Sequence, residues 1–298
     1  MKEDRIFLGK IEDKIKGASE KYMLTYSDFL DPHEHSVASK IMKFDLHCHI
    51  KGGSIDSSID IDEYVNILRS KGFGGMLVTD HDSYKGFNAW ESEGQKNDDF
   101  TVLKGIEYDT RDAGHFIVIM PDGVENKLLT IRGMSLKQLI KVVHSGGGIL
   151  GAAHPFGAKA ASAMFCRKVR RNPGIFKNLD FLEGFNTCEA KEANDKAVAL
   201  AKQYSLPCTG GSDSHNKAHV GKGFTDFSSP IKSNNDLIKS IKANEITSFG
   251  GVEREFLMRH ILKHSFPATW GFRAFNRSIG LAYVFRRRPY LSKLKSNK

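Results

Sequence analysis

The pattern of hydrophobic and polar positions predicts alternating strands and helices. Residues 43–49, KFDLHCH, alternate as a half-buried strand does, and the apolar runs GGMLVTD, FTVLKGIE, HFIVIM, ILGAA and FLEGFN are typical of further strands. Residues 61–70, 135–145, 193–206 and 234–245 carry apolar residues at helical spacing. This alternation predicts an α/β protein with a parallel sheet.

One α/β barrel of ordinary size uses most of the 298 residues and leaves extensions at both ends. Residues 1–42 precede the first predicted strand and carry helix-start signals at Ser27, Asp31 and Pro32, so we expect a helical N-terminal extension. Residues 43–250 form the barrel in this interpretation. Residues 251–298 form a basic, aromatic C-terminal tail.

Positive charge is concentrated in that tail. Residues 250–298 hold eleven Lys or Arg residues and two Glu residues, which accounts for the whole net charge of +9. Basic residues interleaved with aromatic ones suit a nucleic acid or an anionic membrane surface, and they equally suit packing against the barrel with a solvated end.

Localisation is predicted from what the sequence lacks. The chain begins without an apolar signal segment and contains no long apolar run. Its four cysteines form no C-x-x-C pair, so we expect reduced thiols and a cytoplasmic protein. The sequence does not define an oligomeric state.

Histidine and acidic residues gather at the ends of the predicted strands. His47 and His49 are two residues apart on one strand and therefore face the same side. Others follow or open later strands: Asp80 and His81, Glu107, His115, His154, Asp213 and His215. The carboxyl ends of barrel strands share one face, so these side chains should meet there. Imidazoles and carboxylates grouped in this way suit divalent metal ions that activate water.

Taken in order, the segments DLHCH, VTDHD, GIEYDT, GHFIVI, AAHPFG, LEGFN, GGSDSHN and VGKGFT resemble motifs of the polymerase and histidinol phosphatase (PHP) family of metal-dependent phosphoesterases. The resemblance covers about residues 43–225 and extends more loosely to residue 251. It implies a distorted (β/α)7 barrel holding two or three divalent ions. It also implies hydrolysis of a phosphate ester by an ion-bound hydroxide.

The same resemblance assigns ligands to three ions: His47, His49, Glu107 and Asp213 for the first, Glu107, His115 and His154 for the second, and His81, His215 and Asp56 for the third. The third set departs from the family pattern. The usual ligand follows the second histidine by five or six positions, where this chain has Ser54 and Ile55. Asp56 is the nearest acid and needs a small adjustment of the loop. The donor set suits Mn, Fe or Zn.

Other candidates surround these ligands. His81 or His215, where not a ligand, would protonate the leaving oxygen as the catalytic acid. Residues expected to orient imidazoles from behind are Asp45, Asp80 and Glu183. Residues expected to contact phosphate are Lys159 and Arg167, although a solvated helix face explains this basic run equally well.

Several functions fit these features. The first is hydrolysis of a small phosphorylated metabolite or nucleotide, which includes a histidinol-phosphate-type phosphatase. A 5′–3′ exonuclease or nucleotidase acting on nucleic-acid ends would use the basic tail. An amidohydrolase also begins with His-x-His, but it usually places a lysine where this chain has Glu107 and His154. A regulatory module with a lost site is disfavoured because nearly all ligands are present.

Overall fold

The computed structural model describes residues 42–94, 99–157, 161–253 and 266–296, which fall within one compact unit spanning residues 40–298. In this part of the chain, one sheet has the strand order β7-β6-β5-β4-β3-β2-β1-β8-β9. Its strands are β1 (Met42–Cys48), β2 (Gly75–Val78), β3 (Thr101–Thr110), β4 (Gly114–Ile119), β5 (Ile149–Ala152), β6 (Phe181–Asn186), β7 (Cys208–Gly211), β8 (Gly223–Phe227) and β9 (Ile246–Gly251).

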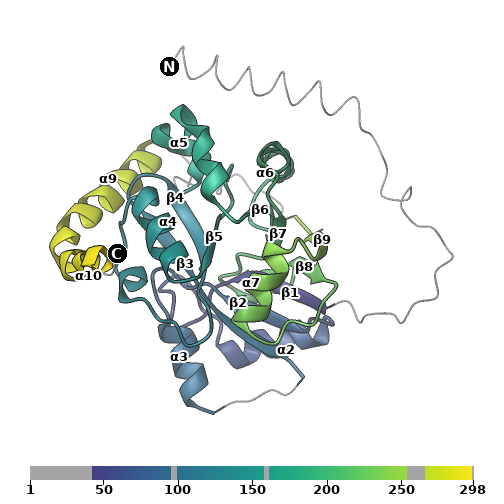
Figure 1. The fold of residues 1–298 in the computed structure, drawn as a ribbon. Coiled ribbons are helices and arrows are strands. Elements are labelled where there is room, and N and C mark those ends of the chain that lie inside the picture. The colour runs from purple at the N-terminus through teal and green to yellow at the C-terminus, as the bar shows by residue number, and fades with distance from the viewer. Residues whose placement is uncertain (1–41, 95–98, 158–160, 254–265, 297–298) are drawn as a thin grey trace. The chain divides into compact units, whose positions relative to one another are not determined.

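The sheet curls until the chain beyond β7 meets β1, so it forms a nearly closed barrel surrounded by helices (Figure 1). The N–H of Asp213 donates to the carbonyl oxygen of His47 at 2.8 Å, and the N–H of His49 donates to that of Ser214 at 3.3 Å. The predicted α/β barrel is thus confirmed.

The strands are not all parallel, and there the sequence-based prediction was wrong. β4 is antiparallel to both β3 and β5, and β8 is antiparallel to β1 and β9. Only residues 111–113 connect β3 to β4. A parallel pair needs a crossover of a dozen or more residues, so this short turn requires a hairpin. As a result, the first residues of β4 lie at the edge where β3 ends.

The helices in the described part of the chain are α2 (Ile61–Ser70), α3 (Lys85–Ser92), α4 (Leu136–Ser145), α5 (Arg167–Arg171), α6 (Lys191–Tyr204), α7 (Asn234–Lys242), α9 (Phe266–Ala282) and α10 (Val284–Ser296). Short 3-10 turns occur at Lys127–Thr130, Ala163–Phe165, Pro173–Asn178 and Lys217–His219. Local sequence explains the helix ends. At α4, Ser135 accepts from the N–H of Gln138, and the Gln138 side chain accepts from that of Ser135, which forms a capping box.

The inward faces of the strands are apolar at one end of the barrel and polar at the other. An apolar cluster joins the strands to α7 through Leu237, Ile238 and Ile241. On β3, Leu103 belongs to this cluster. Glu107 lies four residues further along, on the same face, as strand alternation requires. Burial of these apolar side chains stabilises the barrel, whose other end carries the polar site.

The structure describes almost none of the N-terminal extension but much of the C-terminal tail. The predicted helical extension, residues 1–42, lies outside the described residues except for Met42. The basic tail is helical in its described part, and α9 and α10 lie beside β3 and α4 in Figure 1. None of the helices described combines the length and apolar character that a membrane span requires.

Candidate metal centre

The strand ends bring the predicted ligands together at one edge of the barrel. His47 and His49 lie at the end of β1, His81 follows β2, and Glu107 lies in the second half of β3. His115 reaches the same edge because β4 runs in the opposite direction. The remaining members follow β5 and β7: His154, Asp213 and His215.

Glu107 is the carboxylate around which the imidazoles gather, and its side chain is only 1% exposed. Its Oε1 lies 2.8 Å from Nδ1 of His115 and 2.9 Å from Nε2 of His154. Its Oε2 faces the others: Nε2 of His47 at 3.4 Å, Nε2 of His49 at 3.4 Å and Nδ1 of His81 at 3.2 Å. The two oxygens thus serve two sets of imidazoles, an arrangement that suits a carboxylate bridging two ions.

The two fully buried imidazoles of the centre, those of His47 and His49, each have a nitrogen that lacks the partner that burial normally demands. Nε2 of His47 and Nε2 of His49 have no hydrogen-bond partner among the described residues. Both face Oδ1 of Asp213, at 3.7 Å and 3.3 Å respectively. Buried polar atoms are almost always satisfied, and imidazole nitrogens grouped with carboxylates are typical ligands of divalent transition metals. The residues present therefore fit a metal ion.

Hydrogen bonds hold the opposite nitrogens of the same two rings. Nδ1 of His47 lies 2.8 Å from Oε1 of Glu183. Nδ1 of His49 lies 3.1 Å from Oγ of Ser54, which donates to Oδ1 of Asp80 at 2.9 Å. Such contacts orient each ring and leave Nε2 available as a ligand atom. Sequence reasoning proposed Glu183 and Asp80 for this task but missed Ser54, which the family pattern marks as a ligand position.

A more exposed group lies at the rim of the centre. Oδ2 of Asp56 lies 3.2 Å from Nε2 of His215 and 3.8 Å from Nε2 of His81. The side chains of His81 and His215 are 25% and 22% exposed, whereas His49 is fully buried beneath them. The ring centroids of His49 and His215 are 4.2 Å apart. The loop after β1 therefore brings Asp56 to the histidines despite its offset from the family pattern.

Asp109 belongs to the centre, although the sequence analysis did not select it. Its carboxylate is 2% exposed, contacts Nε2 of His115 and lies 4.0 Å from Nδ1 of His81. It follows Glu107 by two residues on β3, so strand alternation places both on one face. That spacing is the signal that could have identified it.

Three other candidates are placed differently. The pairing of β1 with β2 becomes irregular after Asp45. Its Oδ1 accepts from the backbone N–H of Ser212 at 2.8 Å and of His47 at 3.3 Å, so it ties β1 to the end of β7 and does not reach an imidazole. Arg167 is exposed at the start of α5, and Lys159 lies outside the described residues.

Unfavourable backbone conformations are found at the centre. Asp82, His154 and Asp213 have φ angles of +47°, +30° and +48°. Side chains rarely adopt such angles unless the surrounding structure enforces them. The N–H of His154 donates to Oε2 of Glu183 at 2.7 Å, and the N–H of Asp213 donates to the carbonyl of His47. These hydrogen bonds hold the ligand candidates His154 and Asp213 in place at some cost in backbone strain.

Titration of the metal-free centre is strongly perturbed. Burial opposes protonation of His49, but the carboxylates of Asp213 and Glu107 that face its Nε2 outweigh burial and raise the pKa of His49 to about 9. Burial also favours the neutral form of Glu107, but the neighbouring imidazoles outweigh it and hold the pKa of that carboxyl well below its usual range. Without metal, the centre therefore carries protons that a metal ion would have to displace on binding.

We expect metal binding at pH 7 to release protons, and metal affinity to increase with pH up to about 9. A ligand imidazole must be neutral, whereas His49 is protonated in the metal-free site below pH 9. Below the ordinary imidazole pKa the raised pKa also stabilises the metal-free fold, and this contribution is lost as the pH rises through about 9. Calorimetric titration with Mn²⁺ in two buffers of different ionisation enthalpy measures the protons released.

The control is His144→Gln, since His144 is exposed and pairs with Asp180 at 2.9 Å, away from the centre. This variant should release as many protons as the wild type, and His49→Gln should release fewer. Equal heats in the two buffers for the wild-type protein would contradict the assignment of His49 as a ligand.

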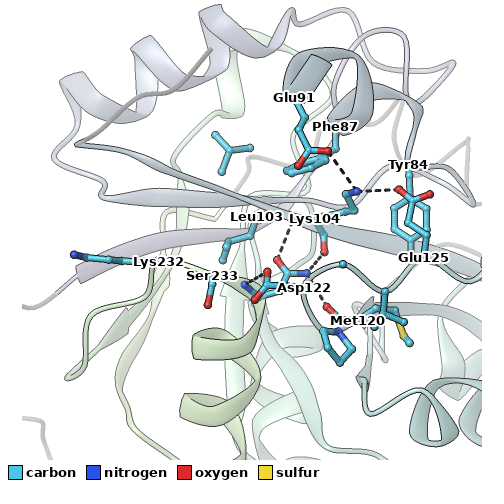
Figure 2. A pocket seen from close by; sticks show the side chains of 15 residues that line it. Tyr84, Phe87, Glu91, Leu103, Lys104, Met120, Asp122, Glu125, Lys232 and Ser233 are labelled. Atoms are coloured by element: carbon cyan, nitrogen blue, oxygen red, sulfur yellow. Dashed lines mark hydrogen bonds and ion pairs between the residues drawn. The ribbon is translucent and has the colours of Figure 1, made fainter. Parts of the chain in front are cut away.

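A separate hollow of about 420 Å³ lies beside the first half of β3 (Figure 2). Lys104 crosses it, with Nζ 2.9 Å from Oε1 of Glu125, 3.7 Å from Oε2 of Glu91 and 4.8 Å from the ring centroid of Phe87. Asn234 donates to the carbonyl of Lys104 at 2.7 Å. Lys104 and Asn234 are thus engaged with their neighbours, and none of the predicted metal ligands lines this hollow.

The fold and the centre define a class of protein, an α/β barrel with a cluster of histidines and carboxylates at its strand ends that could hold metal ions. Comparison with family models narrows this class. A "PHP domain" model matches residues 45–170, and a "PHP-associated" model matches residues 191–246. The chain belongs to the PHP family, as its motifs predicted.

Solved structures share the fold at low identity. PsfC from Pseudomonas syringae PB-5123 is 17% identical, with a TM-score of 0.54 over 80% of this chain and 98% of that chain. The lesion-specific endonuclease PfuEndoQ from Pyrococcus furiosus is 16% identical, with a TM-score of 0.56 over 75% of this chain and 66% of that chain. No curated protein matches the chain.

Proposed function

We propose that the protein is a metal-dependent phosphoesterase that hydrolyses a small phosphorylated metabolite or nucleotide. One observation carries the proposal. The buried carboxylate of Glu107 is shared by five imidazoles, and two of these, His47 and His49, keep an unpartnered Nε2. In a cluster with a purely structural role, buried nitrogens are hydrogen-bonded to other protein groups. Nitrogens that bind a metal ion instead lack a protein partner, because the ion takes that place.

From the contacts of Glu107, Asp213 and Asp56 we assign the residues as follows: His47, His49, Glu107 and Asp213 to one ion, Glu107, His115 and His154 to a second, and Asp56, His81 and His215 to a third. Bound Mn, Fe or Zn would supply Lewis acidity that activates water and neutralises charge on the phosphoryl oxygens. Glu183, Ser54 and Asp80 would keep the rings oriented through Nδ1.

When only the first two ions are bound, His215 is not a ligand, and of the two partly exposed histidines we then assign protonation of the leaving oxygen to it. Its Nδ1 donates to the carbonyl oxygen of Asp213 at 3.0 Å, so its Nε2 faces Asp56 and solvent and can carry a proton when it is not a ligand. Burial and the neighbouring imidazoles lower the pKa of His81 to about 3, so His81 is neutral near pH 7. A neutral ring suits a ligand better than an acid.

Nucleic-acid ends are the second candidate substrate, and the tail favours them. Residues 266–298 contain eight Lys or Arg residues and no acid. Large aromatic side chains stand out from α9 and α10, including Trp270 at 60% exposed and Phe285 at 73%. Exposed aromatic and basic residues suit base stacking and phosphate contacts. The small substrate remains our first choice because residues 1–249, which include the barrel, carry no net charge.

The purified protein, loaded with Mn²⁺, Fe²⁺ or Zn²⁺, is expected to hydrolyse at least one phosphoester of a panel. The panel comprises p-nitrophenyl phosphate, AMP, a 3′,5′-bisphosphonucleotide, histidinol phosphate and a short 5′-phosphorylated RNA. Phosphate release is measured together with the number of metal ions per chain. Activity should disappear in His49→Ala and Asp213→Ala, because both residues lie at the unpartnered nitrogens.

The pattern of activity separates the candidates. Cleavage of RNA whose affinity falls steeply with salt would favour nucleic-acid ends over a small substrate. If no phosphoester of the panel is cleaved and a separate assay with an amide or a cyclic imide shows cleavage, an amidohydrolase would be favoured. A protein that binds no metal after anaerobic reconstitution would rule out the proposal.

A further inference from the structure

Among the described residues of the basic tail, one arginine is buried. Arg287, on α10, is 2% exposed, whereas its neighbours Arg286 and Arg288 are exposed. Its guanidinium donates to the backbone carbonyl oxygens of Arg132 and Gly280. A buried arginine that donates to backbone carbonyls holds a defined geometry, because its planar group allows few alternatives. Arg287 thus acts as a clamp between α9 and the loop that carries Arg132.

A close backbone contact reinforces this clamp. Gly133 has a φ of +90°, and a Cβ atom there would overlap the Cα of Gly280 on α9. The N–H of Gly133 donates to the carbonyl oxygen of Asp109 at 2.9 Å. The loop is therefore fixed on one side to α9 and on the other to β3, where the metal centre lies.

The side chain of Arg132 points from this loop to the centre. Its Nε lies 3.2 Å from Oδ2 of Asp82, and its Nη2 contacts Oδ2 of Asp109. The other oxygen of Asp109 contacts Nε2 of His115. One carboxylate thus links Arg132 to a candidate metal ligand. The Arg132 side chain is 25% exposed, as is that of His81 at the rim.

We propose that Arg132 binds the phosphoryl group of the substrate, and that α9 and α10 act as a positioning element that sets Arg132 through Arg287. The inference rests on the proposed phosphoesterase function and adds to it a substrate contact and a task for the tail. Asp109 contacts Nη2 of Arg132 and Asp82 lies 3.2 Å from its Nε, while neither Nε nor Nη1 has a hydrogen-bond partner in the described part of the chain.

A guanidinium suits this task for physical reasons. It is always charged, and its planar group matches the oxygens of a phosphate. The carboxylates of Asp82 and Asp109 fix its orientation, so little side-chain entropy remains to be lost when substrate binds. Arg167, selected from the sequence, is exposed on α5 and has no comparable support.

The test combines substrate kinetics with direct binding of inorganic phosphate to the metal-loaded protein. Arg132→Lys keeps the positive charge but loses the planar guanidinium group. Arg287→Met removes the hydrogen bonds to the carbonyl oxygens of Arg132 and Gly280. Arg69→Ala is the control, because Arg69 pairs with Asp99 on the outside of the barrel. We expect Arg132→Lys to raise both the KM for p-nitrophenyl phosphate and the Kd for phosphate about tenfold or more, with the metal content unchanged. Arg287→Met should shift both in the same direction by less.

Hydrogen exchange supplies a readout that does not depend on turnover. Arg287→Met should speed exchange of the Gly133 amide in the metal-free protein, because that amide donates to Asp109 only while the loop is held. Arg69→Ala should leave this rate unchanged.

The outcomes distinguish this inference from the proposed function. If the wild type hydrolyses phosphoesters, but Arg132→Lys keeps the KM and phosphate Kd of Arg69→Ala, Arg132 does not bind phosphate and the phosphoesterase stands. If Arg132→Lys instead loses metal while its loaded fraction binds phosphate normally, Arg132 only supports Asp109 and the inference is overturned. If the wild type binds neither metal nor phosphate, the proposed function itself fails.

Discussion

Replacing Glu107 by glutamine is expected to empty the metal centre and abolish hydrolysis. An amide of the same shape cannot supply the negative charge that faces five imidazoles within 3.4 Å. Loss of a contact behind a ligand already costs roughly 10- to 100-fold in metal affinity, so loss of a bridging ligand should cost more. Metal content per chain and the rate of phosphoester hydrolysis measure the effect.

Glu125→Gln is the matched control, since Glu125 pairs with Lys104 beside the separate hollow and is about half exposed. It should retain full metal content and activity. In metal-free protein, Glu107→Gln should also remove an anion that holds protons on His47 and His49, so fewer protons are released on any residual metal binding. A Glu107→Gln protein that binds two ions as tightly as the wild type would contradict the bridging role.

Replacing Gly211 by alanine is expected to destabilise the barrel and damage the centre together. A Cβ at this position, the last residue of β7, would lie 2.7 Å from the backbone nitrogen and 3.1 Å from the Cα of His47. The obstacle is the backbone of β1, which cannot rotate away as a side chain could. Overpacking typically costs roughly 1–3 kcal/mol, and a backbone clash belongs at the upper end of that range. The melting temperature should therefore fall by several degrees.

Gly174→Ala is the control, because its new Cβ would meet only Oδ1 of Asn172, at an ordinary contact distance of 3.6 Å. It should leave the melting temperature and metal content unchanged. Gly211→Ala should lose metal affinity even at temperatures where it is folded, because His47 shifts with β1. An unchanged melting temperature would show that the barrel does not close at this point as described.

The positions of the ligand candidates were largely readable from the sequence. Strand alternation predicted that His47 and His49 share a face, and the end of each apolar run marked Glu107 and Asp213. These predictions succeed because a barrel strand must be apolar where it is buried among its neighbours, so a polar residue at its end stands out. The ligand roles themselves stay predictions until metal is measured.

Other features of the centre depend on pairings that no local pattern encodes. No local pattern predicts that Ser54 links His49 to Asp80, because the three residues lie on different segments. Asp45 has the right spacing to accompany His47, yet the irregular pairing of β1 turns it to the backbone of Ser212.

The sequence by itself determined the α/β class, the strands from β1 to β7 and the residues that gather at their ends, since periodicity and local composition specify these directly. Only the tertiary structure decided that β4 reverses, that Asp109 joins the centre and that Arg287 is buried against the loop of Arg132. Each depends on which distant segments come into contact. From the sequence alone, a basic tail is expected to be solvated. Only the folded structure shows that the guanidinium of Arg287 is buried and donates to backbone carbonyl oxygens.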